Sequence, residues 1–96
     1  MAGVRIKSLE NRETFAEASV TLVGVAPGGV IEFHVHTQEH ETIFVLTGRA
    51  LLLLPNEEVL LEATDGGTIP PGTRHGLKNV GEEPVQLLAI HIPPIM

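Results

Sequence analysis

Hydrophobic and polar residues alternate in short runs along most of this chain, and glycines and prolines separate the runs. Runs rich in apolar residues fall at residues 3–9, 20–26, 30–36, 41–47, 49–54, 58–63, 77–80 and 85–92. Short strand-like runs with turn residues at intervals of roughly eight to twelve residues are typical of a β-sandwich or barrel. The polar segment 11–19 has room for one helical turn, but no segment keeps a helical period over three turns. The pattern therefore predicts an all-β fold.

The run at residues 30–36 follows a Pro-Gly-Gly turn and contains two histidines two positions apart. Because successive side chains of a strand point to opposite faces, His34 and His36 share a face, about 7 Å apart at their Cα atoms. Both imidazoles can then reach one metal ion. Glu41 lies at the start of the next apolar run, and a third imidazole, His75, lies in another turn-bounded segment. We therefore expect one metal site formed by these four residues.

The same alternation places apolar side chains on the opposite face of both strands. If the histidines point into a barrel, the expected outward-facing side chains are Ile31, Phe33, Val35, Thr42, Phe44 and Leu46. An apolar face of this kind needs to be covered by a second sheet or by a partner chain. On this ground we predict a homodimer.

Length and composition narrow the class of protein. The chain has 96 residues, 43% of them hydrophobic, which favours a single domain over residues 1–96 with its own core. It has no cysteine and a net charge of -6 without a basic cluster, so disulfides are excluded and nucleic-acid binding is disfavoured. Its beginning lacks the apolar region of a signal peptide, and no run is long enough to cross a membrane. We expect the cytoplasm as its location.

The spacing of these residues resembles the two sequence motifs of the cupin family. Residues 28–48 match the first motif and residues 64–79 the second, at Gly28, His34, His36, Glu41, Gly48, Pro70, Gly72, His75 and Asn79. The glycine that opens the second motif is replaced by Thr64, which concerns a turn and leaves the metal ligands intact. The resemblance implies a small single-domain cupin with a jelly-roll β-barrel.

Three neutral imidazoles and one carboxylate are ligands that suit a divalent transition metal: Mn, Fe, Ni, Co, Cu or Zn. A structural zinc site would be closed and often contains cysteine, which this chain lacks. Four protein ligands at an octahedral ion leave two positions for water, substrate or dioxygen. Because imidazole must be deprotonated to bind an ion, we expect metal loss as the pH falls below a histidine pKa of about 6.5.

The resemblance implies three classes of function, all involving a small-molecule ligand. The first, which we favour, is a metal-dependent oxidoreductase similar to a dioxygenase. The second is a non-redox enzyme such as an isomerase or a decarboxylase, and the third is a module that binds a small ligand without turnover. Cupin regulators often carry a helix-turn-helix domain, for which this chain has no room, so a stand-alone transcription factor is excluded.

Three further residues near the predicted site have two possible roles each. His40 is out of phase with Glu41 and is expected to be a polar loop residue rather than a ligand. Glu39 is an alternative to Glu41 if the loop is short, although the motif spacing favours Glu41. His91 lies in the final apolar run, where it is either satisfied by a hydrogen bond or faces the cavity as a proton carrier. It is the one candidate for a catalytic residue outside the metal ligands.

The composition also describes the expected pocket. The chain has no Tyr or Trp and three phenylalanines, so the pocket offers no phenol for acid-base chemistry and little aromatic surface for stacking. Valine, leucine and isoleucine are expected to line it, which favours a small ligand. Arg49 and Lys78 are cations near the motifs with two possible roles: either one holds an anionic substrate, or both lie at the solvated surface, which we expect.

Overall fold

Nine strands and no helix make up the described part of the protein, residues 3–96 of a computed structural model, so the all-β prediction is confirmed. No helix that could cross a membrane occurs among these residues. The strands are β1 (Val4–Glu10), β2 (Ser19–Val25), β3 (Val30–His34), β4 (His40–Thr47), β5 (Arg49–Leu54), β6 (Glu57–Glu62), β7 (Gly66–Ile69), β8 (His75–Asn79) and β9 (Val85–Ile92).

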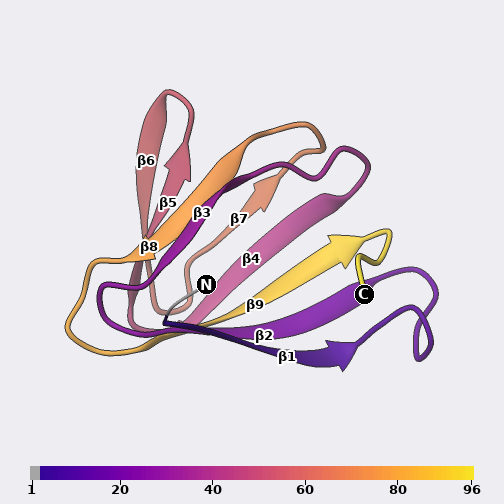
Figure 1. Ribbon diagram of the computed structural model, residues 1–96, viewed down its shortest axis with the longest axis horizontal. Helices are drawn as coiled ribbons and strands as arrows, with labels where there is room; N and C mark the ends of the chain where they lie inside the picture. The colour runs from indigo at the N-terminus through magenta and orange to yellow at the C-terminus, as the bar shows by residue number, and fades with distance from the viewer. Residues whose placement is uncertain (1–2) are drawn as a thin grey trace.

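The strands form two antiparallel sheets, as in a jelly roll. The five-stranded sheet has the order β1-β2-β9-β4-β7, and the four-stranded sheet has the order β3-β8-β5-β6. In Figure 1 the strands of the first sheet fan out side by side, and the four-stranded sheet forms the second layer. The last strand, β9, lies between β2 and β4, so the end of the chain is built into the middle of the larger sheet.

The apolar core lies between the sheets, and strand alternation decides which residues enter it. Along β4 the buried positions are Glu41, Ile43 and Val45, and along β9 the buried series Val85, Leu87, Ala89 continues to His91. Because every second residue of a strand faces the same side, the pattern that buries aliphatic side chains also directs Glu41 and His91 inward. The core thereby sets the orientation of two ionisable side chains.

Strand β3 differs from the prediction in its length and in its faces. It ends at His34, and its pairing with β8 shifts register between Ile31 and His34. Such an irregularity resets the alternation of the side chains. Ile31 is therefore half-buried and packs against the core, so its predicted outward orientation is wrong, whereas Phe33 and Val35 are each 43% exposed.

The segment between β1 and β2 makes a single turn that does not continue as a helix. The carbonyl oxygen of Asn11 accepts hydrogen bonds from the backbone N–H groups of Thr14 and Phe15 at 3.0 and 2.8 Å. The side-chain oxygen of Asn11 also accepts from the N–H of Glu13 at 2.9 Å. These local bonds satisfy the backbone within the turn, and residues 11–18 contain no regular element.

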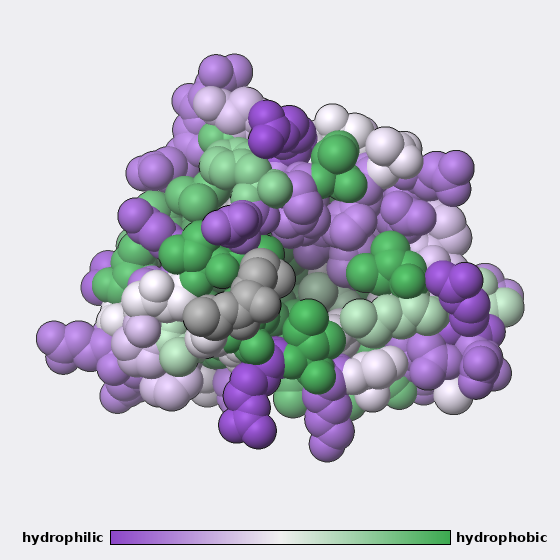
Figure 2. All heavy atoms as spheres, viewed as in Figure 1, coloured by the Kyte–Doolittle hydropathy of each residue, from purple (hydrophilic) through white to green (hydrophobic). Residues whose placement is uncertain are grey.

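Apolar side chains remain on the outer face of β4, as the alternation predicted. Phe44 and Leu46 are 37% and 38% exposed. On the face seen in Figure 2, groups of hydrophobic side chains lie between hydrophilic ones. This arrangement agrees with the reason given for a homodimer, which stays a prediction.

Candidate metal centre

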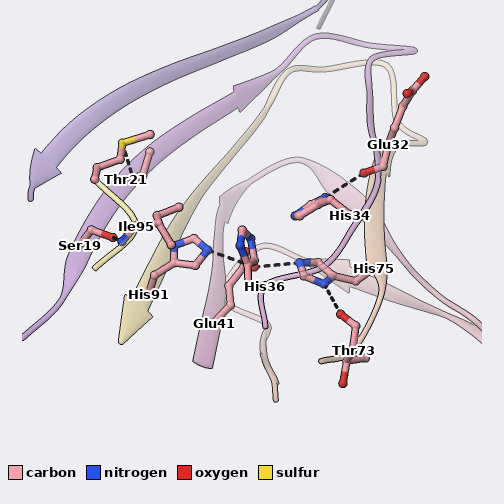
Figure 3. A network of polar contacts seen from close by, with 11 residues as sticks. Ser19, Thr21, Glu32, His34, His36, Glu41, Thr73, His75, His91 and Ile95 are labelled. Carbon is pink, nitrogen blue, oxygen red and sulfur yellow. Dashed lines mark hydrogen bonds and ion pairs between the residues drawn. The ribbon is translucent and has the colours of Figure 1, made fainter. Parts of the chain in front are cut away.

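Two cross-strand pairs, one from each sheet, bring four ionisable side chains to the same interior region. In the four-stranded sheet His34 of β3 lies opposite His75 of β8, and in the five-stranded sheet Glu41 of β4 lies opposite His91 of β9. Opposite residues of an antiparallel pair have their Cβ atoms about 5 Å apart. His36, two residues beyond the end of β3, completes the group, and Figure 3 shows the five side chains gathered together.

One oxygen of Glu41 lies at the centre of this group. Its Oε1 atom is 2.8 Å from Nε2 of His75, 3.2 Å from Nε2 of His91 and 3.5 Å from Nε2 of His36. The ring of His34 lies against that of His75, with centroids 4.3 Å apart. The structure therefore brings the four residues predicted as ligands together and adds His91 beside them.

The separations between donor atoms fit a transition-metal ion. His34, His36, Glu41 and His75 each offer one ligand atom, and these atoms all lie within 4.8 Å of one another. Two ligands on opposite sides of an ion, each at roughly 2.1 Å, are about 4.2 Å apart. The most widely separated donor atoms therefore need to approach by no more than about 0.6 Å for the group to hold an ion.

Backbone acceptors orient two of the imidazoles in the way a metal site requires. Nδ1 of His34 lies 2.9 Å from the carbonyl oxygen of Glu32, and Nδ1 of His75 lies 2.9 Å from that of Thr73. A carbonyl oxygen can only accept, so each Nδ1 carries the proton. In the neutral ring Nε2 then presents its lone pair to the site, and a backbone carbonyl on the other ring nitrogen is the usual partner of a metal-binding histidine.

Electrostatics at the centre favour an ionised carboxylate. Burial disfavours the charge of Glu41, but the neighbouring His75 and His91 imidazoles outweigh it and lower the pKa of Glu41 to about 2. Burial also opposes protonation of His75, yet the hydrogen bonds to Glu41 and to the Thr73 carbonyl raise its pKa above the ordinary 6.5. For His36 burial prevails, and its pKa is lowered.

The contact between His75 and Glu41 shows why a cation belongs here. Both Nε2 of neutral His75 and the ionised Glu41 oxygen present lone pairs, and they lie only 2.8 Å apart. A positive charge between them, either a proton or a metal ion, is needed to make that contact favourable. A divalent transition metal fits this donor set, since imidazole nitrogen and carboxylate oxygen both suit such ions.

Glycines of the two motifs hold the ligand-bearing segments in place. The backbone N–H of Gly72, which has a φ of 82°, donates a 2.8 Å hydrogen bond to the carbonyl oxygen of His36. This bond ties the turn before β8 to the segment that carries His36. Next to His75, a Cβ atom on Gly76 would lie 2.7 Å from the carbonyl oxygen of Ile31, so only glycine permits this close approach of β8 to β3.

Asn79, the last residue of the second motif, is structural. Its buried amide donates to the carbonyl oxygens of Val25 and Glu83 at 3.0 and 2.8 Å, and its oxygen accepts from the N–H of Gly81 at 2.9 Å. These bonds fix the turn between β8 and β9. Thr64, which stands where the motif has glycine, adopts a left-handed φ of 73°, which explains why glycine suits that position.

A cavity of about 330 Å³ adjoins the centre. His34, His36, Glu41, His75 and His91 contribute to its wall, and the rest is mostly aliphatic, as the composition indicated. This volume lies at the lower end of the roughly 300–1,000 Å³ typical of ligand pockets. The cavity therefore suits a small molecule that is largely apolar, with a polar part directed to the imidazoles.

The other candidate residues lie outside this cavity. His40 is exposed at the first position of β4, and Glu39 precedes it in the loop. Arg49 is exposed at the surface, 3.6 Å from Glu62, and Lys78 is partly exposed on β8. The observed phase of β4 places Glu41, and not Glu39, at the centre.

The sequence left two roles open for His91, a hydrogen-bonded position in the strand or a position facing the cavity. It is 4% exposed and lines the cavity, so it is more deeply buried than a half-buried position would be. The signal that could have placed it is the alternation of the final strand, where Val85, Leu87 and Ala89 share its face. Its proximity to Glu41 depends on the pairing of β4 with β9, which no local pattern predicts.

Known proteins resemble this chain in sequence and in structure. It is 32% identical over 83 residues to an uncharacterized protein of Methanocaldococcus jannaschii, covering 86% of this chain and 62% of that protein. It is 37% identical over 59 residues to quercetin 2,3-dioxygenase of Bacillus subtilis, covering 62% of this chain and 18% of the enzyme. The chain thus spans less than two thirds of the length of these relatives.

The fold and the family follow from two further comparisons. The crystal structure of a predicted oxalate decarboxylase from Thermotoga maritima superposes with a TM-score of 0.89 at 24% identity, covering 94% of this chain and 80% of that one. At this identity the likeness shows a shared fold. The family model of the cupin domain matches residues 21–91, most of the chain. The protein therefore belongs to the cupin family.

Proposed function

We propose that this protein is a metal-dependent enzyme, similar to a dioxygenase, that acts on a small molecule in the cavity. The observation that carries the proposal is the convergence of three imidazoles and one carboxylate within 4.8 Å at the wall of that cavity. In a structural site protein ligands fill all coordination positions of the ion, whereas a catalytic site keeps a coordination position open to a cavity for substrate. The ligands proposed are His34, His36, Glu41 and His75.

The protein's own side chains prepare this site in three ways. Glu41, with its pKa lowered to about 2, supplies a permanent negative charge near neutral pH. The carbonyl oxygens of Glu32 and Thr73 hold the rings of His34 and His75 with Nε2 free to bind. Burial lowers the pKa of His36 and so keeps it neutral at pH 7. A bound ion would supply Lewis acidity and, if redox-active, the ability to react with dioxygen.

The aliphatic wall contributes by excluding water from the reacting groups. In such surroundings electrostatic interactions are stronger than in water. The relation to quercetin 2,3-dioxygenase of Bacillus subtilis supports an oxidative reaction, although the two share only part of their length. The same donor set also accepts zinc, so a non-redox decarboxylase or isomerase is the alternative, followed by a binding module without turnover.

The first experiment measures metal. Protein purified without a metal-binding tag, or reconstituted with Fe, Mn or Zn, is expected to hold about one ion per chain by elemental analysis. The variants Glu41→Gln and His75→Ala should lose most of it, because each removes one donor. His40→Gln, which changes an exposed histidine outside the cavity, serves as the matched control. Failure of the reconstituted wild-type protein to retain any ion would refute the proposal.

The second experiment separates the classes of function. Oxygen uptake by the iron or manganese form, over a panel of small diketones, thiols and phenols, is expected for a dioxygenase. Turnover by the zinc form without oxygen would instead indicate a decarboxylase or isomerase. Binding of a ligand with no turnover by any metal form would indicate a binding module.

A further inference from the structure

His91 is a deeply buried side chain that lines the cavity but is not one of the proposed metal ligands. It is 4% exposed, and neither of its ring nitrogens has a hydrogen-bond partner within residues 3–96. Its Nε2 atom is 3.2 Å from Oε1 of Glu41, an ion-pair distance drawn in Figure 3, but the geometry there does not satisfy a hydrogen bond. His91 also lies outside the group of four ligand residues.

The contrast with two other histidines makes this position unusual. Nδ1 of His34 and Nδ1 of His75 each have a backbone carbonyl as partner, whereas Nδ1 of His91 has none. A buried polar group without a hydrogen-bond partner lowers the free energy of unfolding, so it destabilises the folded protein. Because His91 lines the cavity beside His36, with ring centroids 4.8 Å apart, a bound molecule can provide the missing partner.

The rest of the cavity wall indicates what kind of molecule that is. Away from the histidines the wall is mostly aliphatic, with residues from β1, β2, β9 and the C-terminal segment: Val4, Ile6, Val23, Leu87, Ile95 and Met96. No Lys or Arg is found among its lining residues in the described chain. Because Glu32 and Glu41 both line the cavity, an anionic group can bind only beside a divalent ion, which would offset the charges of these two carboxylates.

We propose that His91 is a ligand-binding residue that hydrogen-bonds the polar head of a small aliphatic acid bearing a second oxygen next to its carboxylate. The head lies beside His91 and the ion-binding residues, on the side that faces the cavity, and the hydrocarbon chain lies along the aliphatic wall. This inference rests on the proposed metal centre, and it assigns the substrate class of that same site. It makes His91 a determinant of specificity in addition to the four ligands.

Calorimetry on the zinc-loaded protein tests the proposal, because zinc is not redox-active and therefore supports no oxidation of the bound probe. The probe is 2-hydroxyhexanoate, with hexan-1-ol as the compound that keeps the chain and lacks the acid. We expect the acid to bind and the alcohol to bind at least about tenfold more weakly. His91→Phe, which keeps a ring without nitrogen, should weaken binding of the acid about five- to tenfold, the value of one hydrogen bond.

Two controls accompany this variant. His91→Gln places an amide near the position of Nε2 and should stay within about threefold of the wild-type affinity. His40→Phe makes the same chemical change at an exposed histidine and should have no effect. As a measurement independent of folding in the variants, the ring nitrogen shifts of His91 in the zinc-loaded wild-type protein should move when the probe is added.

The outcomes distinguish a failure of the His91 proposal from a failure of the metal centre on which it rests. A wild-type protein that retains no zinc refutes the metal centre. If zinc is retained but 2-hydroxyhexanoate does not bind, the ligand class is wrong. Equal affinities in His91→Phe and wild type, or unchanged ring nitrogen shifts of His91, overturn its role. Loss of zinc from His91→Phe would show that His91 supports the metal site, which also overturns it.

Discussion

Replacing Glu41 by glutamine should remove most of the acid sensitivity of the metal-free protein. Glutamine keeps the shape of the side chain but cannot ionise, and its NH2 group can donate to Nε2 of neutral His75. In the wild-type protein the same contact of 2.8 Å requires a proton between an ionised carboxylate and an imidazole. The two proteins therefore differ in how protonation is linked to folding.

The magnitude follows from the pKa of Glu41, which falls from its ordinary 4.5 to about 2 in the folded protein. A difference of roughly 2.5 units corresponds to about 3 kcal/mol of unfolding free energy. Because the folded pKa is the lower one, this contribution is present above pH 4.5 and is lost as the pH falls towards 2. The pKa of His75 is raised by the same contact, so its effect is part of this energy and is not added to it.

Urea unfolding of chelator-treated wild type and Glu41→Gln, from pH 7 down to pH 2.5, measures this difference. We expect the advantage of the wild-type protein to shrink by roughly 2–3 kcal/mol over that range, since the other carboxyl groups are common to both. His40→Gln should follow the wild-type curve. Parallel curves for wild type and Glu41→Gln would refute the reasoning, because Glu41 would then titrate alike in the folded and unfolded chain.

Further predictions concern the turns, the ion and the outer face. Asn79→Ala should destabilise the protein by about 2–4 kcal/mol in urea unfolding, since the carbonyl group of Val25 and two partly buried backbone groups of the β8–β9 turn lose this partner. Thr64→Gly should stabilise it by up to about 1 kcal/mol by relieving a φ of 73°, and a loss of stability would contradict this. Bound metal should be released as the pH falls from about 6.5 to 4, because protons compete for His75, and elemental analysis showing the same content at pH 4 would exclude this. Light scattering at micromolar concentration should report a dimer that Phe44→Ser weakens, and a wild-type monomer would refute the homodimer.

The sequence was sufficient for the fold class and for four of the five side chains that gather at the centre. Alternation with period two is a local property of the sequence. The predicted bounds of β2, β4, β5 and β9 therefore agree with the observed ones to within about two residues. The turns at Gly48 and Gly72 could also be predicted from the sequence, because a backbone with φ values of 87° and 82° selects glycine. The motif spacing then predicted which histidines and which glutamate lie together.

Strand β7 and the irregularity in β3 depend on pairing between distant segments. The Gly-Gly sequence of β7 is typical of a turn, and it becomes a strand because β4 offers it a hydrogen-bonded edge. The register shift opposite β8 turns Ile31 inward against the simple alternation. Local sequence contains no information on either, because both are properties of two strands rather than of one.

The residue types of the chain establish which donor atoms it offers, whereas the pairing and packing of its strands establish which of these atoms meet. The pairing of β4 with β9 sets His91 opposite Glu41, and the packing of the two sheets leaves a cavity beside them. Side-chain chemistry is encoded residue by residue, whereas the distance between Glu41 and His91 depends on the path of the 49 residues between them. For that reason a histidine that is ambiguous in the sequence has a defined place, and a testable role, in the folded protein.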